Sequence, residues 1–213
     1  MAARRVVAGE QVDAWLEALA SASVEPGGGA FAALSAASGS ALVEAVARRT
    51  LRRSGDGGGR LDEIVAEVAG ARPVLLALAD RDAEAFRATI DAYRMPHDDD
   101  DARTRRLIVL QEALEEAIDV QLDLARRSVY LLGLADEVTR EGDPNAAADG
   151  LSAAAAFHAA TTAAVANAEI NAFAIADVER RTGLMETCGA LRERAATLLD
   201  DVQATFRSRI AVG

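Results

Sequence analysis

The 213-residue chain contains no lysine, a single cysteine and only 4% aromatic residues. The lone Cys188 cannot form a disulfide within the chain, which favours a reducing compartment such as the cytoplasm. The first residues include two arginines but no apolar run after them, so a secretory signal is not expected. The net charge of −11 disfavours nucleic acids and anionic membranes as partners, although a pocket can still bind a small anionic ligand.

Large apolar side chains are also scarce, because alanine supplies much of the 51% hydrophobic fraction. Alanine buries little area, so a core built from it depends on close approach between backbones. Alternating β-branched runs, which are typical of strands, are missing, while apolar residues recur at helical spacing over most of the chain. These patterns predict an all-α fold: one domain over residues 1–213, formed by a bundle of five to seven helices, several of them long and alanine-rich.

Glycine, proline and acidic segments separate the predicted helices. The helices are expected at about 9–22, 30–53, 61–94, 102–139 and 146–181, and from Gly183 to about 210. Pro73 is expected to begin a new helix or to kink one. Glu44 and several Ser and Gly residues favour a buried helix over a membrane span at 30–47. Faces lined with small residues pack closely either within the bundle or against a second subunit, so a homodimer is one expectation.

Four segments, in this order, resemble the formiminotransferase-cyclodeaminase C-terminal family. They are PGGG with the small-residue run after it (26–50), LADRDAEAFRATIDAYRMP (78–96), LQEALEEAIDVQLDLARRS (110–128), and GDPNAAADG followed by NAEIN (142–171). The resemblance implies an all-helical dimer with folate sites in clefts at the subunit contact. It also implies one of two activities: closure of the N5-formimino group of tetrahydrofolate onto N10 with loss of ammonia, or hydrolysis of 5,10-methenyl-tetrahydrofolate.

The glycine run Gly27, Gly28 and Gly29 has two interpretations. Glycines can adopt positive φ and leave N–H groups bare at a helix N-terminus, which favours an anionic or carbonyl group of a ligand. The run can instead be a tight turn that lets two helix backbones approach. The resemblance adds a folate-binding role for the three glycines.

Both activities need proton transfer, which a carboxyl group with a raised pKa can perform. Asp80 and Asp82 belong to the family's acidic segment and lie two positions apart on a helix, so at most one is expected to face the cleft. Asp82 is predicted as the catalytic group because Phe86, four residues later, indicates a half-buried face. The alternative is a solvated acidic face beside Arg81.

Further candidates lie in the segment 142–171. Capping of the following helix explains Asp143 and Asn145, whereas Asp149 matches the family's aspartate and is predicted to bind the pterin ring or to transfer protons. Asn167 and Asn171 share one face of an alanine-rich helix, and their amides need partners from the ligand or from another helix.

Two departures from the family pattern affect the expected pocket. Arg53 stands where the family has lysine, and a guanidinium there can bind a folate glutamate carboxylate bidentately. The family's Val-Pro dipeptide is replaced by Val120-Gln121, flanked by Asp119 and Asp123. This face of the helix is therefore either solvent-exposed or rebuilt around different polar groups.

His97 and His158 are isolated and lack the spacing of metal ligands, so no metal is expected. The expected ligand is a tetrahydrofolate derivative, bound as substrate. Two alternatives remain open: a diverged family member that makes or breaks another C–N bond in a specialised biosynthetic pathway, and a non-catalytic helical dimer.

Overall fold

The computed structural model describes residues 12–55 and 59–211, which form six α-helices and one short 3-10 helix without any strand. The first predicted helix begins, at residue 9, outside the described residues. The elements are α1 (Val12–Leu19), α2 (Gly28–Ser54), α3 (Arg60–Arg94), α4 (Asp100–Glu141), the 3-10 helix η2 (Pro144–Ala146), α5 (Ala147–Ala172) and α6 (Val178–Ala211). The predicted all-α bundle is confirmed.

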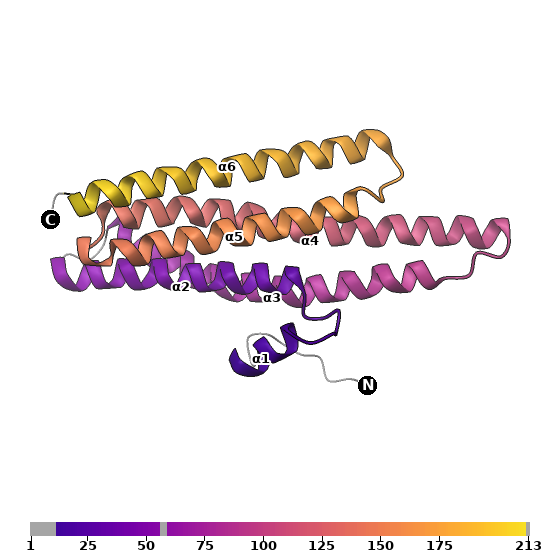
Figure 1. Cartoon of the computed structure of the whole chain (residues 1–213), viewed down its shortest axis with the longest axis horizontal. Coiled ribbons are helices and arrows are strands. Elements are labelled where there is room, and N and C mark those ends of the chain that lie inside the picture. The colour runs from indigo at the N-terminus through magenta and orange to yellow at the C-terminus, as the bar shows by residue number, and fades with distance from the viewer. Residues whose placement is uncertain (1–11, 56–58, 212–213) are drawn as a thin grey trace.

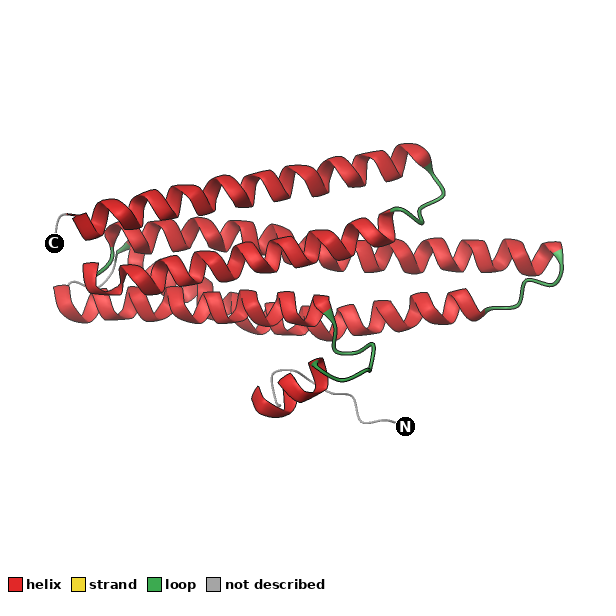
Figure 2. Cartoon of the chain, viewed as in Figure 1, coloured by secondary structure: helices red, strands yellow, loops and turns green. Residues whose placement is uncertain are grey.

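The five long helices run side by side, and α1 lies beside the bundle near the first residues of α2 (Figures 1 and 2). The most extensive contacts join α4 to α5, α2 to α3 and α2 to α5. Small residues make the contact between α2 and α5 close. A Cβ atom added at Gly39 would lie 3.0 Å from the buried ring of Phe157 and 3.1 Å from the carbonyl oxygen of Ala153.

Helix α2 is long and apolar enough, by length and composition, to cross a membrane. However, its alanine face is buried in the bundle, where Ala32, Ala33 and Ala36 have no exposed surface. Ser40 is also fully buried, and its hydroxyl donates to the Ala37 carbonyl oxygen at 2.7 Å. This packing supports the interpretation of α2 as a core helix.

Two features of the predicted helices differ in the structure. Helix α3 continues through the exposed Pro73, so Pro73 does not begin a new helix. The predicted helix 146–181 is two helices, because Asp177 caps α6 by accepting the N–H groups of Glu179 (2.9 Å) and Arg180 (3.0 Å). Gly183, predicted to separate helices, lies inside α6.

The loop between α5 and α6 is held by a side chain from α4. Gln111 donates from Nε2 to the Ala174 carbonyl oxygen at 3.1 Å and accepts the Ala176 N–H at 2.7 Å. Because this anchor comes from a distant helix, the local sequence of the loop does not reveal it.

Candidate active site

A pocket with a volume of about 960 Å³ lies where the first turn of α2 meets α3 and the last turns of α5. This volume is at the upper end of the range found for small-molecule sites. Its lining includes Gly27, Gly28, Gly29, Asp82, Asn167 and Asn171. Six of the eight predicted site residues, which are far apart in the sequence, therefore meet around one cavity.

The Asp82 carboxylate lines this pocket and is held by a side chain from a neighbouring helix. Its Oδ1 atom accepts a hydrogen bond of 2.5 Å from the Nε2 atom of Gln121 on α4. A Cβ atom added at Gly29 would overlap the carboxylate and would lie 2.5 Å from Gln121 Nε2. The backbone of α2 can approach this carboxylate–amide pair only because residue 29 has no side chain.

Burial raises the pKa of Asp82 above its ordinary value, since a low-dielectric environment disfavours the charged form. The Gln121 hydrogen bond acts in the opposite direction, and the nearby Glu25 carboxylate raises the pKa of Asp82 further. A carboxyl group shifted upward in this way exchanges its proton closer to neutral pH, as acid–base catalysis requires.

The glycine run forms the N-terminal end of α2. Gly27 caps this helix with extended backbone angles (φ −127°, ψ −155°), and among the described residues only Gly55 has a positive φ. The positive φ expected at residues 27–29 is therefore not adopted. The glycines instead allow the backbone of α2 to lie close to side chains of neighbouring helices. The Phe31 N–H makes the first intrahelical bond, to the Gly27 carbonyl (3.0 Å), so the N–H groups of the preceding turn lack intrahelical acceptors.

The two asparagines line the pocket from α5, as their spacing predicts. Asn167 donates from Nδ2 to the Ala163 carbonyl oxygen of its own helix at 2.8 Å. A Cβ atom added at Gly28 would lie 3.0 Å from this Nδ2 atom, which is a second close approach of the glycine run. Glu169 faces another direction, as expected, and pairs with Arg192 of α6 at 2.6 Å.

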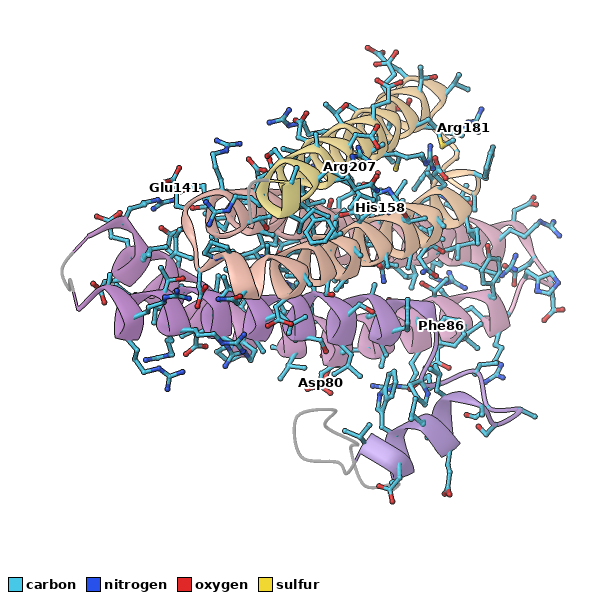
Figure 3. The ribbon with its side chains drawn as sticks, turned by 60° about the vertical axis from the view of Figure 1, so that its left-hand side comes forward. Asp80, Phe86, Glu141, His158, Arg181 and Arg207 are labelled. Atoms are coloured by element: carbon cyan, nitrogen blue, oxygen red, sulfur yellow. The ribbon has the colours of Figure 1, made fainter. Side chains whose placement is uncertain are left out.

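Asp80 and Asp82 of α3 both line the pocket, so the expectation that at most one of them would do so is wrong. The pocket is wide enough to extend around the surface of α3 from Asp82 to Asp80. Figure 3 shows Asp80 at the surface of the bundle, on the side where α1 lies. Only Asp82 contacts Gln121, and Arg81 between them pairs with Glu116 of α4 at 2.8 Å.

Arg53 and Asp149 lie at the other end of the bundle and do not line the pocket of this chain. There Arg53 pairs with Asp143 at 2.8 Å, and Arg49 pairs with Asp149 at 3.0 Å. Asp149 is separated from Asn167 by about 27 Å of helix axis. The chain brings neither residue to Asp82, and their assignment to the site stays a prediction.

Sequence reasoning missed the roles of Gln121 and Trp15. Gln121 is 1% exposed, whereas Asp119 is exposed and Asp123 pairs with Arg127 at 2.8 Å, so the flanking aspartates face solvent and the amide faces inward. Gln121 is a polar residue within the apolar stripe of α4, and this was the signal that could have identified its role. Trp15 lines the pocket from α1, and its Nε1 atom is buried without a hydrogen-bond partner in the part of the chain that the structure describes.

Several known proteins are similar to this chain in sequence. The formiminotransferase-cyclodeaminase family model matches residues 11–190. A methenyltetrahydrofolate cyclohydrolase from Methylorubrum extorquens is 32% identical over 194 residues, which cover 87% of this chain and 93% of that protein. The mouse formimidoyltransferase-cyclodeaminase is 34% identical over 154 residues, but the match spans only 28% of its length.

The same likeness appears in three dimensions. A crystal structure of the formiminotetrahydrofolate cyclodeaminase from Thermotoga maritima superposes with a TM-score of 0.82 and 26% sequence identity. The superposition covers 96% of this chain and 99% of that one, so the whole helical bundle is shared. By sequence and by structure, this chain belongs to the formiminotransferase-cyclodeaminase family.

Proposed function

We propose that this protein is a folate-dependent one-carbon enzyme that hydrolyses 5,10-methenyl-tetrahydrofolate. The observation that carries the proposal is Asp82, a partly buried carboxyl group with a raised pKa in a pocket that also presents side-chain amides and the N-terminal end of α2. The cyclohydrolase from Methylorubrum extorquens matches this chain over nearly its full length, which favours hydrolysis as the first candidate activity.

The reaction requires two proton transfers that a single carboxyl group can perform. The water oxygen bonds to the bridging carbon of the methenyl group while Asp82 takes up one of its protons. The C–N bond to one bridging nitrogen then breaks as Asp82 returns this proton to that nitrogen. The second water proton passes to solvent as the formyl group forms. One water molecule is consumed, and the positive charge of the methenyl bridge is lost as a released proton.

The remaining pocket groups suit the heterocycle of a folate. A pterin ring presents both donors and acceptors along its edge, and the side-chain amides of Asn167 and Asn171 can pair with either kind. The N–H groups of Gly28 and Gly29 offer donors to a carbonyl oxygen. We assign these four residues to ligand binding and Asp82 to proton transfer.

The cyclodeaminase reaction is the second candidate, favoured by the likeness to the Thermotoga maritima enzyme. Asp82 would then remove the N10 proton as N10 attacks the formimino carbon, and it would return a proton to the departing ammonia. The same pocket and the same carboxyl group would serve both reactions.

Two assays distinguish these candidates. Purified protein is mixed with 5,10-methenyl-tetrahydrofolate and its absorbance is followed against the spontaneous hydrolysis rate; in parallel, ammonia release from 5-formimino-tetrahydrofolate is measured. We expect accelerated loss of the methenyl absorbance. Ammonia release alone would support the cyclodeaminase. If the protein accelerates neither reaction, the proposal is wrong, and other C–N chemistry or a non-catalytic dimer is favoured.

We further propose that the protein acts as a cytoplasmic homodimer. Ile170 and Phe173 at the end of α5 are 70% and 69% exposed, and Phe31 near the start of α2 is 41% exposed. These apolar side chains lie at or near the pocket residues, where a second copy would remove them from water. Sedimentation equilibrium tests the proposal: a mass of twice that of the chain supports it, and a monomer contradicts it.

A further inference from the structure

Gln121 is a buried polar group that the proposed chemistry does not yet use. It is 1% exposed in the middle of α4, and Ile118 and Leu122 beside it are buried. Gln121 does not line the pocket itself, but it contacts Asp82, which does. Any effect of Gln121 on a ligand must therefore act through Asp82.

The two ends of the Gln121 amide have different surroundings. Nε2 donates to Asp82 Oδ1 at 2.5 Å, while Oε1 is buried and has no hydrogen-bond partner among the described residues. A buried acceptor without a partner destabilises the folded state, and most such groups in proteins are paired. Oε1 is therefore an acceptor that a proton donor can still use.

The protonated form of Asp82 supplies such a donor. An amide N–H can donate to an ionised carboxylate, but the O–H of a carboxylic acid needs an acceptor. A half-turn of the terminal amide group exchanges Nε2 and Oε1, and this terminal torsion has no steep staggered preference. Gln121 can thus donate to one form of Asp82 and accept from the other.

We propose that Gln121 is a positioning residue that holds the Asp82 carboxyl group in the pocket in both of its protonation states. The inference rests on the proposed function, since a carboxyl group that takes up and releases one proton must stay aligned with the ligand throughout. Gly29 makes the arrangement possible, because any side chain there would displace both groups.

The other charged groups around Asp82 do not provide the same contact. Glu25, from the segment before α2, raises the pKa of Asp82 and is itself paired with Arg87 at 2.5 Å. Asp80 is a second acidic group along the pocket, and α5 contributes the neutral Asn167. The hydrogen bond from Gln121 is the interaction that lowers the pKa of Asp82, so its removal should raise that pKa.

The test replaces Gln121 by Met, which has a similar length and no amide. The carboxyl carbons of ¹³C-labelled aspartates are titrated by NMR, and the Asp82 signal is assigned by its absence in Asp82→Asn. We expect the pKa of Asp82 to rise by about one unit in Gln121→Met, because the hydrogen bond donated to the ionised carboxylate is stronger than the one accepted from the neutral acid. The control is Ser128→Ala, which removes a buried hydroxyl from the same helix and should leave that pKa unchanged.

An unchanged Asp82 pKa in folded Gln121→Met would overturn the proposal. Because the titration needs no turnover, this outcome is distinct from a failure of the proposed function. If Gln121→Met does not fold, Gln121→Glu is used instead. In this variant the two neighbouring carboxyl groups should share a proton, and one of them should titrate well above the pKa of wild-type Asp82. If both carboxyl groups titrated independently, each near the ordinary pKa of its type, the proposal would be overturned.

Where turnover is measurable, kinetics provide a second readout. Gln121→Met should lower kcat about tenfold or more with KM changed less than about threefold, and it should move the acidic limb of the rate profile upward by about one pH unit. A purely structural role would lower the melting temperature without moving this limb, and that result would also overturn the proposal.

Discussion

Replacing Asp82 by Asn lowers kcat by about 10²–10⁴-fold and leaves the helical circular dichroism signal intact. The amide keeps the shape of the side chain. In the wild type, Gln121 donates to Asp82 Oδ1 at 2.5 Å, and the oxygen of the introduced amide can accept the same hydrogen bond. What the substitution removes is the ability to take up a proton. The measurement is the rate of methenyl-tetrahydrofolate hydrolysis by protein of verified fold.

The stability of this variant gives an independent check. Because burial raises the pKa of Asp82 in the folded protein, its contribution to stability is fully present at low pH and is lost as pH rises through the raised value. Asp82→Asn should therefore melt at the same temperature as wild type or higher at neutral pH. Asp91→Asn, an exposed substitution on the same helix, is the control and should retain wild-type turnover. Equal rates in both variants would remove Asp82 from the mechanism.

Gly29→Ala is expected to damage both stability and turnover through one added methyl group. That methyl would overlap the Asp82 carboxylate and approach Gln121 Nε2 to 2.5 Å, so α2 must shift or the pair must separate. Overpacking of this kind costs about 1–3 kcal/mol. We expect a lower melting temperature and at least a tenfold loss of kcat/KM, measured on the same preparation.

The matched control is Gly183→Ala. Gly183 lies inside α6, and a Cβ atom added there would meet no atom within 4 Å. Replacing glycine by alanine in a helix interior stabilises by about 0.5–1 kcal/mol, so this variant should melt higher than wild type and keep its activity. If Gly29→Ala behaved like Gly183→Ala, the close approach of α2 to Asp82 would be refuted.

The fold could be predicted because its information is local. Helical spacing and the lack of strand patterns define the bundle, and the small residues of α2 explain its burial. The end of α5 could not be predicted from the run 146–181, because the break depends on Gln111, which reaches the loop from α4. The Asp177 cap is a local signal for the start of α6, which the alanine-rich composition obscured.

The lining of the candidate pocket was predictable where a motif and a helix face coincide. Asp82 and Asn167 fall on faces that their spacing marks as half-buried, and the chain brings them together. Gln121 was noted only as a departure from the family pattern, because its contact with Asp82 joins residues from two helices. Arg53 and Asp149 were assigned by motif alone, and a motif does not show at which end of a long helix the pocket lies.

The central claim is that the folate binds beside Asp82, at the N-terminal end of α2. Calorimetric titration of 5-formyl-tetrahydrofolate into wild type, Asn167→Ala and Arg53→Ala tests it directly, because the two substitutions lie near opposite ends of the bundle. The account predicts that Asn167→Ala raises Kd about tenfold or more, while Arg53→Ala stays within about twofold of wild type. The reverse pattern, with affinity lost only in Arg53→Ala, would contradict it.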